Sequence, residues 1–184
     1  MNKTAKRMLR AMDNALKWWP LPAVGPEKGR LLRRLIDRHR PTRAIELGSL
    51  FGYSAVLIGA SLPPGGRLTC IEASEFLAGL VKRSAEAAGI GRRVTVVPGE
   101  ALRVIPLLRS RFDFVLIDAV KEDYLDYLRS LEPKLERGAV VVADNTGIFR
   151  RETKPYLDYV RASERYQTRE HDFGWDCMEV SILS

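Results

Sequence analysis

Short apolar runs alternate with helix-like stretches through most of this chain. Each run is largely continuous rather than alternating in polarity, and glycine, proline or polar residues bound it. Continuous runs of this kind are typical of strands in a parallel sheet that is covered on both faces. The pattern predicts strands at about 43–47 (RAIEL), 67–72 (RLTCIE), 93–97 (RVTVV), 113–118 (DFVLID) and 138–143 (GAVVVA).

Helical patterns fill the intervals between these runs. The stretch at 74–88 places apolar residues such as Phe76 and Leu80 at the spacing of one helix face. Strands that alternate with helices form a doubly wound, Rossmann-like α/β sheet with helices on both faces. Further helices are expected at about 53–61, 100–109 and 121–131.

The two ends of the chain follow a different pattern. After a helix near 152–162, the runs RYQTRE and DCMEVSIL flank a turn-like DFG, which predicts an antiparallel hairpin on the sheet edge. The sheet is therefore expected to have seven strands, most of them parallel. Helices are expected at 2–18 and 26–39, ahead of the sheet. We expect one domain over 1–184, with N-terminal helices or a lid at 1–40 and a core at 41–184.

Polar side chains end two of the predicted strands. Asp118 closes DFVLID with Lys121 three residues later, and Asp144 and Asn145 follow AVVVA. Ligands of open α/β sheets bind beyond the carboxyl ends of the strands, so these side chains are expected to converge. Taken singly, Asp118 is better explained as a helix N-cap, Asp144-Asn145 as a turn pair and Lys121 as a surface lysine. Their convergence favours a site for a hard, oxygen-bound cation.

The first two strands also end in unusual residues. In ELGSLFGYS, Gly48 and Gly52 allow a tight turn close to a ligand, and Glu72 ends the second strand. An acid at that place can accept hydrogen bonds from both ribose hydroxyls of a nucleoside cofactor. Leu47 stands where a dinucleotide loop has its first glycine, which argues against a pyrophosphate. Plain turn glycines and a solvated strand end are the alternative.

These motifs together resemble the metal-dependent class I S-adenosylmethionine O-methyltransferases, especially those of the catechol O-methyltransferase type. The resemblance runs from about Val24 to the C-terminus through VGPEKG, ELGSLFGYSAV, CIE, VTVVPGEALRVIP, LIDAVKEDY, ADN and DCMEVSI. The order and spacing of the two acid-ended strands are far more specific than one glycine turn.

The resemblance implies a role for each matching residue. S-adenosylmethionine would be bound by residues on four strand ends and the loop before them. A divalent cation such as Mg²⁺ would be held by Asp118, Asp144 and Asn145, with Lys121 as the catalytic base. The implied cofactor contacts are Val24, Glu46, Gly48 and Ser54 at the methionine end, Glu72 at the ribose, Glu100 and Ala101 near the adenine, and Asp118.

The substrate implied by the resemblance is a catechol-like vicinal aromatic diol. Glu170, in TREHD, aligns with a carboxylate that binds the second hydroxyl, although this alignment crosses a variable hairpin. Phe149 stands where the animal enzyme has proline, and Trp18, Trp19 and Pro20 precede Val24. These side chains can contact an aryl ring of the substrate, or they can belong to the hydrophobic core without a role in binding. The short N-terminal region leaves open a lid completed by a second copy, that is, a homodimer.

Composition changes this picture little. The net charge of +7 suits a nucleic-acid binder, but basic and acidic residues are interspersed, as on solvated helix faces. Cys70 and Cys177 lie in strand-like surroundings and are expected to be buried free thiols. Neither a signal-peptide pattern nor an apolar stretch of roughly 18 residues is found, so we expect a cytoplasmic protein without membrane contact.

Three functions remain compatible with the sequence. The first is methylation of an aromatic diol, and the second is methylation of a hydroxylated uridine in transfer RNA, which the positive charge suits. The third is a cofactor-binding module without catalysis, or a dinucleotide oxidoreductase. The presence of Asp118, Lys121, Asp144 and Asn145 argues against the module, and the absence of G-x-G-x-x-G argues against the oxidoreductase.

Overall fold

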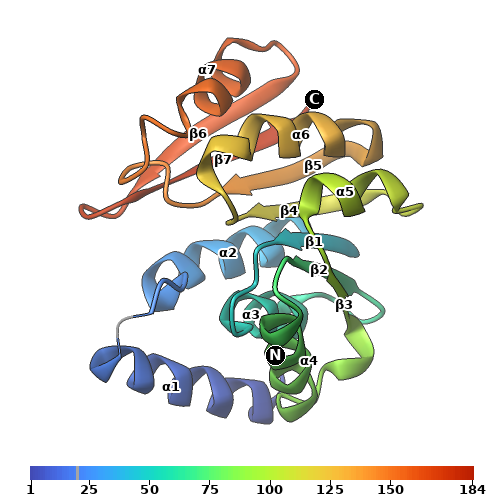
Figure 1. Ribbon diagram of the computed structural model, residues 1–184, viewed down its shortest axis with the longest axis vertical. Coiled ribbons are helices and arrows are strands. Elements are labelled where there is room, and N and C mark those ends of the chain that lie inside the picture. The colour runs from blue at the N-terminus through green and yellow to red at the C-terminus, as the bar shows by residue number, and fades with distance from the viewer. Residues whose placement is uncertain (20) are drawn as a thin grey trace.

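The computed structural model, which describes residues 1–19 and 21–184, contains one seven-stranded sheet. The strand order is β3-β2-β1-β4-β5-β7-β6, and helices lie on both faces (Figure 1). The four pairings from β3 to β5 are parallel, whereas β7 is antiparallel to both β5 and β6. The predicted doubly wound sheet with an antiparallel C-terminal hairpin is therefore confirmed. The strands are β1 (Arg43–Leu47), β2 (Arg67–Glu72), β3 (Val94–Pro98), β4 (Phe112–Ile117), β5 (Leu135–Ala143), β6 (Tyr166–Asp172) and β7 (Cys177–Leu183).

The helices agree with the sequence pattern except at 100–109 and 121–131. The first of these is α5 (Ala101–Val104) followed by a 3₁₀ turn, because Pro106 lacks the N–H that a longer α-helix would use. The second begins as a 3₁₀ turn at Lys121–Asp123 before α6 (Tyr124–Leu131). The other helices are α1 (Lys3–Trp18), α2 (Gly25–His39), α3 (Tyr53–Ser61), α4 (Glu75–Ala87) and α7 (Lys154–Ala162).

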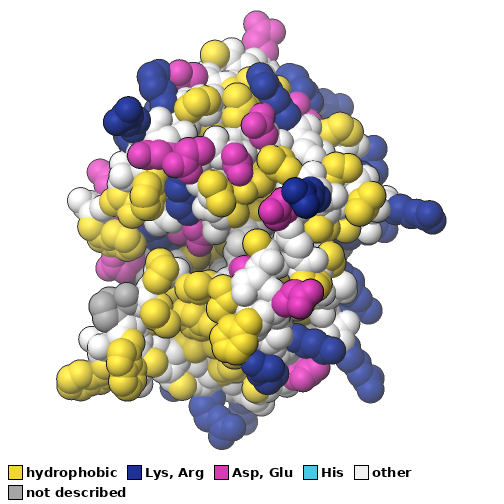
Figure 2. Space-filling view, in the orientation of Figure 1, with side chains coloured by type: hydrophobic (Ala, Val, Ile, Leu, Met, Phe, Trp, Pro, Cys, Tyr) yellow, Lys and Arg dark blue, Asp and Glu magenta, His cyan; other side chains and the backbone are white. Residues whose placement is uncertain are grey.

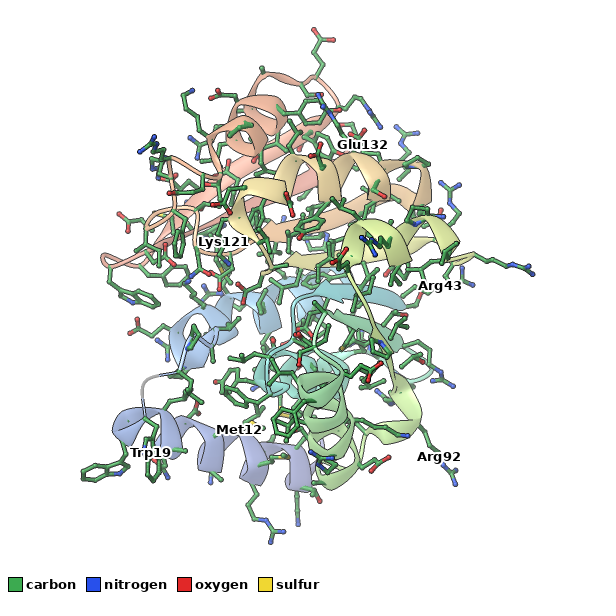
Figure 3. The ribbon with its side chains drawn as sticks, in the orientation of Figure 1. Met12, Trp19, Arg43, Arg92, Lys121 and Glu132 are labelled. Carbon is green, nitrogen blue, oxygen red and sulfur yellow. The ribbon has the colours of Figure 1, made fainter. Side chains whose placement is uncertain are left out.

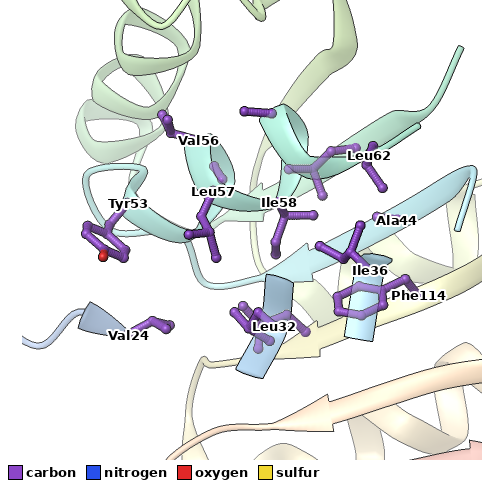
Figure 4. Close-up of a cluster of buried hydrophobic side chains, with 14 of the residues drawn as sticks. Val24, Leu32, Ile36, Ala44, Tyr53, Val56, Leu57, Ile58, Leu62 and Phe114 are labelled. Atoms are coloured by element: carbon purple, nitrogen blue, oxygen red, sulfur yellow. The ribbon is translucent and has the colours of Figure 1, made fainter. Parts of the chain in front are cut away.

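Two hydrophobic cores lie between the sheet and its helices, one on each face. On one face α1 to α4 pack against the sheet, and Figure 4 shows Leu32 and Ile36 of α2 close to Ile58 of α3. On the other face α5, α6 and α7 cover side chains such as Val115 and Val141. Cys70 and Cys177 are buried free thiols, as the sequence predicts. Within the described ranges, no helix has both the length and the apolar character that a bilayer span requires.

Strand register brings the four strand ends to one level. Leu47 of β1 pairs with both Ile71 of β2 and Ile117 of β4, and Ile117 pairs with Ala143 of β5. Backbone N–H to carbonyl hydrogen bonds, 2.9 to 3.0 Å between nitrogen and oxygen, continue this alignment one residue beyond the paired positions. The next residues along the chain therefore stand side by side at the carboxyl edge, and they are Gly48, Glu72, Asp118 and Asp144. The order reverses between β1 and β4, where ligands of such sheets bind.

Candidate active site

A cavity of about 970 Å³ opens at this carboxyl edge. It extends from the linker before α2, past the loop after β1, to the turn between β6 and β7. Figure 2 shows hydrophobic side chains gathered over α1 and the adjoining part of this face. The structure thus brings together most of the predicted site residues. Those that line the cavity are Val24, Gly48, Ser54, Glu72, Glu100, Ala101, Asp118, Lys121, Asp144, Asn145 and Phe149.

The loop after β1 is held by the acid that ends β2. Glu72 Oε2 accepts hydrogen bonds of 3.0 Å from the backbone N–H groups of Ser49 and Leu50, and Oε1 accepts one of 3.1 Å from Ser74. Glu72 lines the cavity, yet only 7% of its side chain is exposed. Glu72 therefore fixes the conformation of the loop that lines the cavity, in addition to the ribose contact that the sequence suggests.

Gly48 permits the closest approach of two strand ends. Its φ of +79° lies in the left-handed region, and a Cβ there would come within 2.2 Å of the Asp118 carbonyl oxygen. We expect Gly48→Ala to lower the free energy of unfolding by more than about 3 kcal/mol and to weaken cofactor binding, measured by denaturant titration and calorimetry.

Gly138→Ala is a matched control for this substitution. Gly138 has nearly the same φ, +80°, but a Cβ there meets nothing within 4 Å. Only the cost of the backbone conformation, about 1 kcal/mol, is expected. Equal losses of stability in the two variants would contradict the steric explanation.

Glu46 lies beneath the same loop and is fully buried. Its Oε2 accepts a 2.6 Å hydrogen bond from Ser49 Oγ, whereas Oε1 has no partner in the described part of the chain. Burial raises the pKa of Glu46, and the hydrogen bond from Ser49 opposes this shift. An unpartnered buried acceptor is costly, so this oxygen is available to a hydrogen-bond donor, although Glu46 is not among the described residues that line the cavity.

Two carboxylates and a lysine meet at the ends of β4 and β5. Lys121 Nζ lies 2.8 Å from Asp118 Oδ1 and 2.9 Å from the Tyr124 hydroxyl, which donates to the Asp144 carbonyl at 3.0 Å. Burial raises the pKa values of Asp118 and Asp144, and repulsion by Asp118 raises that of Asp144 further. Figure 3 marks Lys121, in the segment between β4 and α6. Two acids that repel each other in one cavity favour a cation between them.

The plainer explanations of these residues are only partly right. The N-cap of α6 is Asp123, so the helix-cap explanation of Asp118 is wrong. Lys121 is largely buried and not a free surface lysine. Asp144 and Asn145 immediately precede the turn that begins at Thr146, and Asn145 has φ +58° with its N–H donating to Asp144 Oδ1 at 2.7 Å. Both also line the cavity.

Two residues of central importance were missed from the sequence. Lys28 of α2 is 1% exposed and its Nζ contacts Asp144 Oδ1 and Asp176 Oδ2. Asp176, which precedes β7, is 2% exposed. A buried lysine is unusual, so composition gave no reason to expect one, although Lys28 stands within the VGPEKG motif. Trp175 also lines the cavity, half-exposed, with its ring 4.7 Å from Lys28 Nζ.

Two predicted substrate residues stand elsewhere. Glu170 of β6 forms ion pairs with Arg150 at 2.5 Å and Arg161 at 2.8 Å, and Trp19 is 70% exposed at the end of α1 (Figure 3). Neither is among the described residues that line the cavity. Pro20 lies outside the described residues. The structure therefore does not bring Glu170 or Trp19 to the acidic cluster.

An open α/β sheet with a glycine turn, an acid-ended second strand and an acidic cluster defines a class of nucleoside-cofactor enzymes. The chain belongs to the O-methyltransferase family, whose family description matches residues 3–162. It is 35% identical to catechol O-methyltransferase of Bos taurus over 151 residues, 78% of this chain and 55% of that protein. It is 31% identical to catechol O-methyltransferase of Mus musculus over 182 residues, 94% of this chain and 68% of that protein.

Solved structures of O-methyltransferases share the fold of this chain. The O-methyltransferase from Bacillus cereus, solved in complex with SAH, superposes with a TM-score of 0.85 at 24% identity. The match covers 100% of this chain and 92% of that structure. The chain spans only about half the length, 55%, of the first curated relatives it matches.

Proposed function

We propose that this chain is an S-adenosylmethionine-dependent, divalent-metal-dependent O-methyltransferase acting on a catechol-like vicinal aromatic diol. The observation that carries this proposal is the meeting of Asp118, Asp144, Asn145 and Lys121 in the same cavity as the loop after β1. Membership of the O-methyltransferase family supports the reaction, and the catechol O-methyltransferase relatives support the substrate class.

The donor atoms of the acidic cluster fit a hard divalent cation. Oδ2 of Asp118, Oδ2 of Asp144 and Oδ1 of Asn145 accept no hydrogen bond from any described residue. Three free oxygens suit Mg²⁺, which binds few protein ligands and leaves coordination positions open. No cluster of three or more His, Cys, Asp or Glu side chains arranged for a metal occurs in the described ranges. The proposed set differs because its third ligand is an amide.

The chain's own residues would position the methyl donor. Glu46 Oε1 and the loop after β1 fit the amino acid end of S-adenosylmethionine, and Glu72 fits its ribose. The cofactor supplies a methyl group already activated on a sulfonium. Holding that methyl in line with a hydroxyl oxygen is then the main task of the protein.

Lys121 would handle the proton of the reacting hydroxyl. A bound divalent cation supplies positive charge that favours the ionised form of a phenol. Lys121 Nζ, positioned by Asp118 and Tyr124, would take the hydroxyl proton as a neutral amine that has released its own proton to solvent, while the bond from oxygen to the methyl carbon forms and the carbon–sulfur bond breaks. Phe149 and Trp175, two partly exposed aromatic residues that line the cavity, would flank the aryl ring.

Methyl transfer from labelled S-adenosylmethionine to a panel of catechols tests this proposal. We expect methyl transfer in the presence of Mg²⁺ and its loss with excess chelator. The proposed ligands Asp118, Asp144 and Asn145 carry no positive charge that could replace that of the cation. Methyl transfer that persists in excess chelator would contradict the proposed dependence on a divalent metal. Cofactor binding without methylation of any diol would contradict the substrate class and favour the transfer RNA alternative.

A further inference from the structure

Asp176 gathers four hydrogen bonds at the edge of the acidic cluster. Its Oδ1 accepts from the backbone N–H groups of Gly147 at 3.1 Å and Ile148 at 2.9 Å. Its Oδ2 accepts from Lys28 Nζ at 2.5 Å and from Asn145 Nδ2 at 2.8 Å. A carboxylate with four donors and almost no exposure is held in one orientation.

The bond to Asn145 decides which way its amide faces. An ionised carboxylate only accepts hydrogen bonds, so the NH₂ group of Asn145 must point at Asp176. The carbonyl Oδ1 of Asn145 is then on the opposite side of the amide. Without Asp176, either orientation of the amide is open to Asn145, and only one of them offers oxygen to a cation.

The backbone around Asn145 is held by the same carboxylate. Asp176 Oδ1 binds the N–H groups two and three residues after Asn145, and a Cβ at Gly147 would lie 3.0 Å from that oxygen. The Thr146 N–H also donates to the Cys177 carbonyl at 3.0 Å. The start of β7 therefore fixes both the main chain and the side chain of Asn145.

Lys28 connects Asp176 to the other strand-end acid. Its ammonium group bridges Asp176 Oδ2 and Asp144 Oδ1, and the Trp175 ring covers it at 4.7 Å. With Oδ1 of Asp144 occupied by Lys28 and by the Asn145 N–H, Oδ2 is left for another ligand. The ammonium group of Lys28 thus offsets the negative charges of two buried carboxylates. Without it, the two charges would repel each other, and burial would favour the neutral, protonated form of the acids.

We propose that Asp176, together with Lys28, is a positioning residue that aims Asn145 Oδ1 and Asp144 Oδ2 at the divalent cation. This inference rests on the proposed function, because it assigns a role toward the metal of that site. It makes the C-terminal hairpin and α2 parts of the metal site, although neither supplies a ligand. Hydrogen-bonded partners of this kind typically change metal affinity about 10- to 100-fold when removed.

Asp176→Asn is the main test, because it keeps the shape of the side chain but adds a donor where Asp176 only accepts. We expect the affinity for Mn²⁺, measured by calorimetry on the full chain, to fall about 10- to 100-fold. The affinity for S-adenosylhomocysteine is expected to stay within about twofold, since Asp176 contacts none of the proposed cofactor residues. Asp172→Asn, the same change on the same hairpin, is the control, because Asp172 is exposed and, among the described residues, its carboxylate accepts a hydrogen bond from the Gly174 N–H alone.

The outcomes separate this inference from the proposed function. An unsubstituted protein that binds no Mn²⁺ would overturn the proposed metal itself. Mn²⁺ binding that is equal in the unsubstituted protein and Asp176→Asn would leave the metal in place and overturn the positioning role. A loss of S-adenosylhomocysteine affinity equal to that of Mn²⁺ would also overturn it, by showing a general structural effect.

A measurement on the unsubstituted protein keeps the inference testable if the variant does not fold. In a nitrogen-15 spectrum of the metal-free protein, the Asn145 side-chain amide protons are expected to exchange slowly with solvent, because one is bonded to Asp176. Addition of Mg²⁺ should shift the signal without abolishing this protection. Fast exchange of both protons, comparable with an exposed asparagine such as Asn14, would overturn the inference.

Discussion

Replacing Asp144 by alanine is expected to lower metal-dependent turnover at least about 100-fold, because a metal's stabilisation of transition-state charge is worth several kcal/mol. Asp144 would supply one of the three proposed metal oxygens from the end of β5. Cofactor affinity should change little, since the loop after β1 is held by Glu72 and Glu46. Steady-state rates with Mg²⁺ and calorimetry with S-adenosylhomocysteine measure the two effects.

The fold should tolerate this substitution. Lys28 keeps Asp176 as a partner, so the lysine is not left as an unpaired buried charge. Asp126→Ala, on the exposed side of α6, is the matched control and should behave like the unsubstituted protein. Turnover that survives in Asp144→Ala would remove the metal site from the proposed mechanism.

Replacing Lys121 by alanine is expected to reduce kcat by about 10²- to 10⁴-fold, the usual contribution of a positioned acid or base. KM should change little at saturating Mg²⁺, because Lys121 is proposed to act on the proton rather than on binding. Rapid single-turnover measurements would show whether the methyl transfer step itself has slowed. An unaltered kcat would exclude Lys121 as the base.

Lys121→Arg separates proton transfer from charge. Arginine keeps a positive charge beside Asp118 and Tyr124, but it does not lose its proton in proteins. We therefore expect Lys121→Arg to be nearly as slow as Lys121→Ala. Recovery of most of the rate in the arginine variant would show that Lys121 acts through its charge.

Much of the fold was predictable because strand and helix periodicity is a local property. The predicted 43–47, 67–72 and 53–61 agree with β1, β2 and α3 to the residue. The deviations also have local causes, such as the 3₁₀ turn at Pro106. The convergence of Asp118 and Asp144 followed from topology alone, since adjacent parallel strands end at one edge.

Glu170 shows where prediction from sequence stopped. Its position in a hairpin is clear from the sequence, but the face on which it lies depends on strand register. In the structure Glu170 pairs with Glu179 across β6 and β7, and both carboxylates bind Arg161. The acid of this hairpin that reaches the cluster is Asp176, six residues further along.

The sequence by itself determined the sheet, its cofactor loop and the strand ends that carry Asp118, Lys121, Asp144 and Asn145, because periodicity and turn chemistry act over a few residues. Only the tertiary structure decided what surrounds them. Lys28 and Asp176 are 148 residues apart, and no local pattern links a buried lysine to the carboxylate that compensates its charge. Burial and long-range pairing are properties of the packed chain, so the residues that orient the site became visible only in three dimensions.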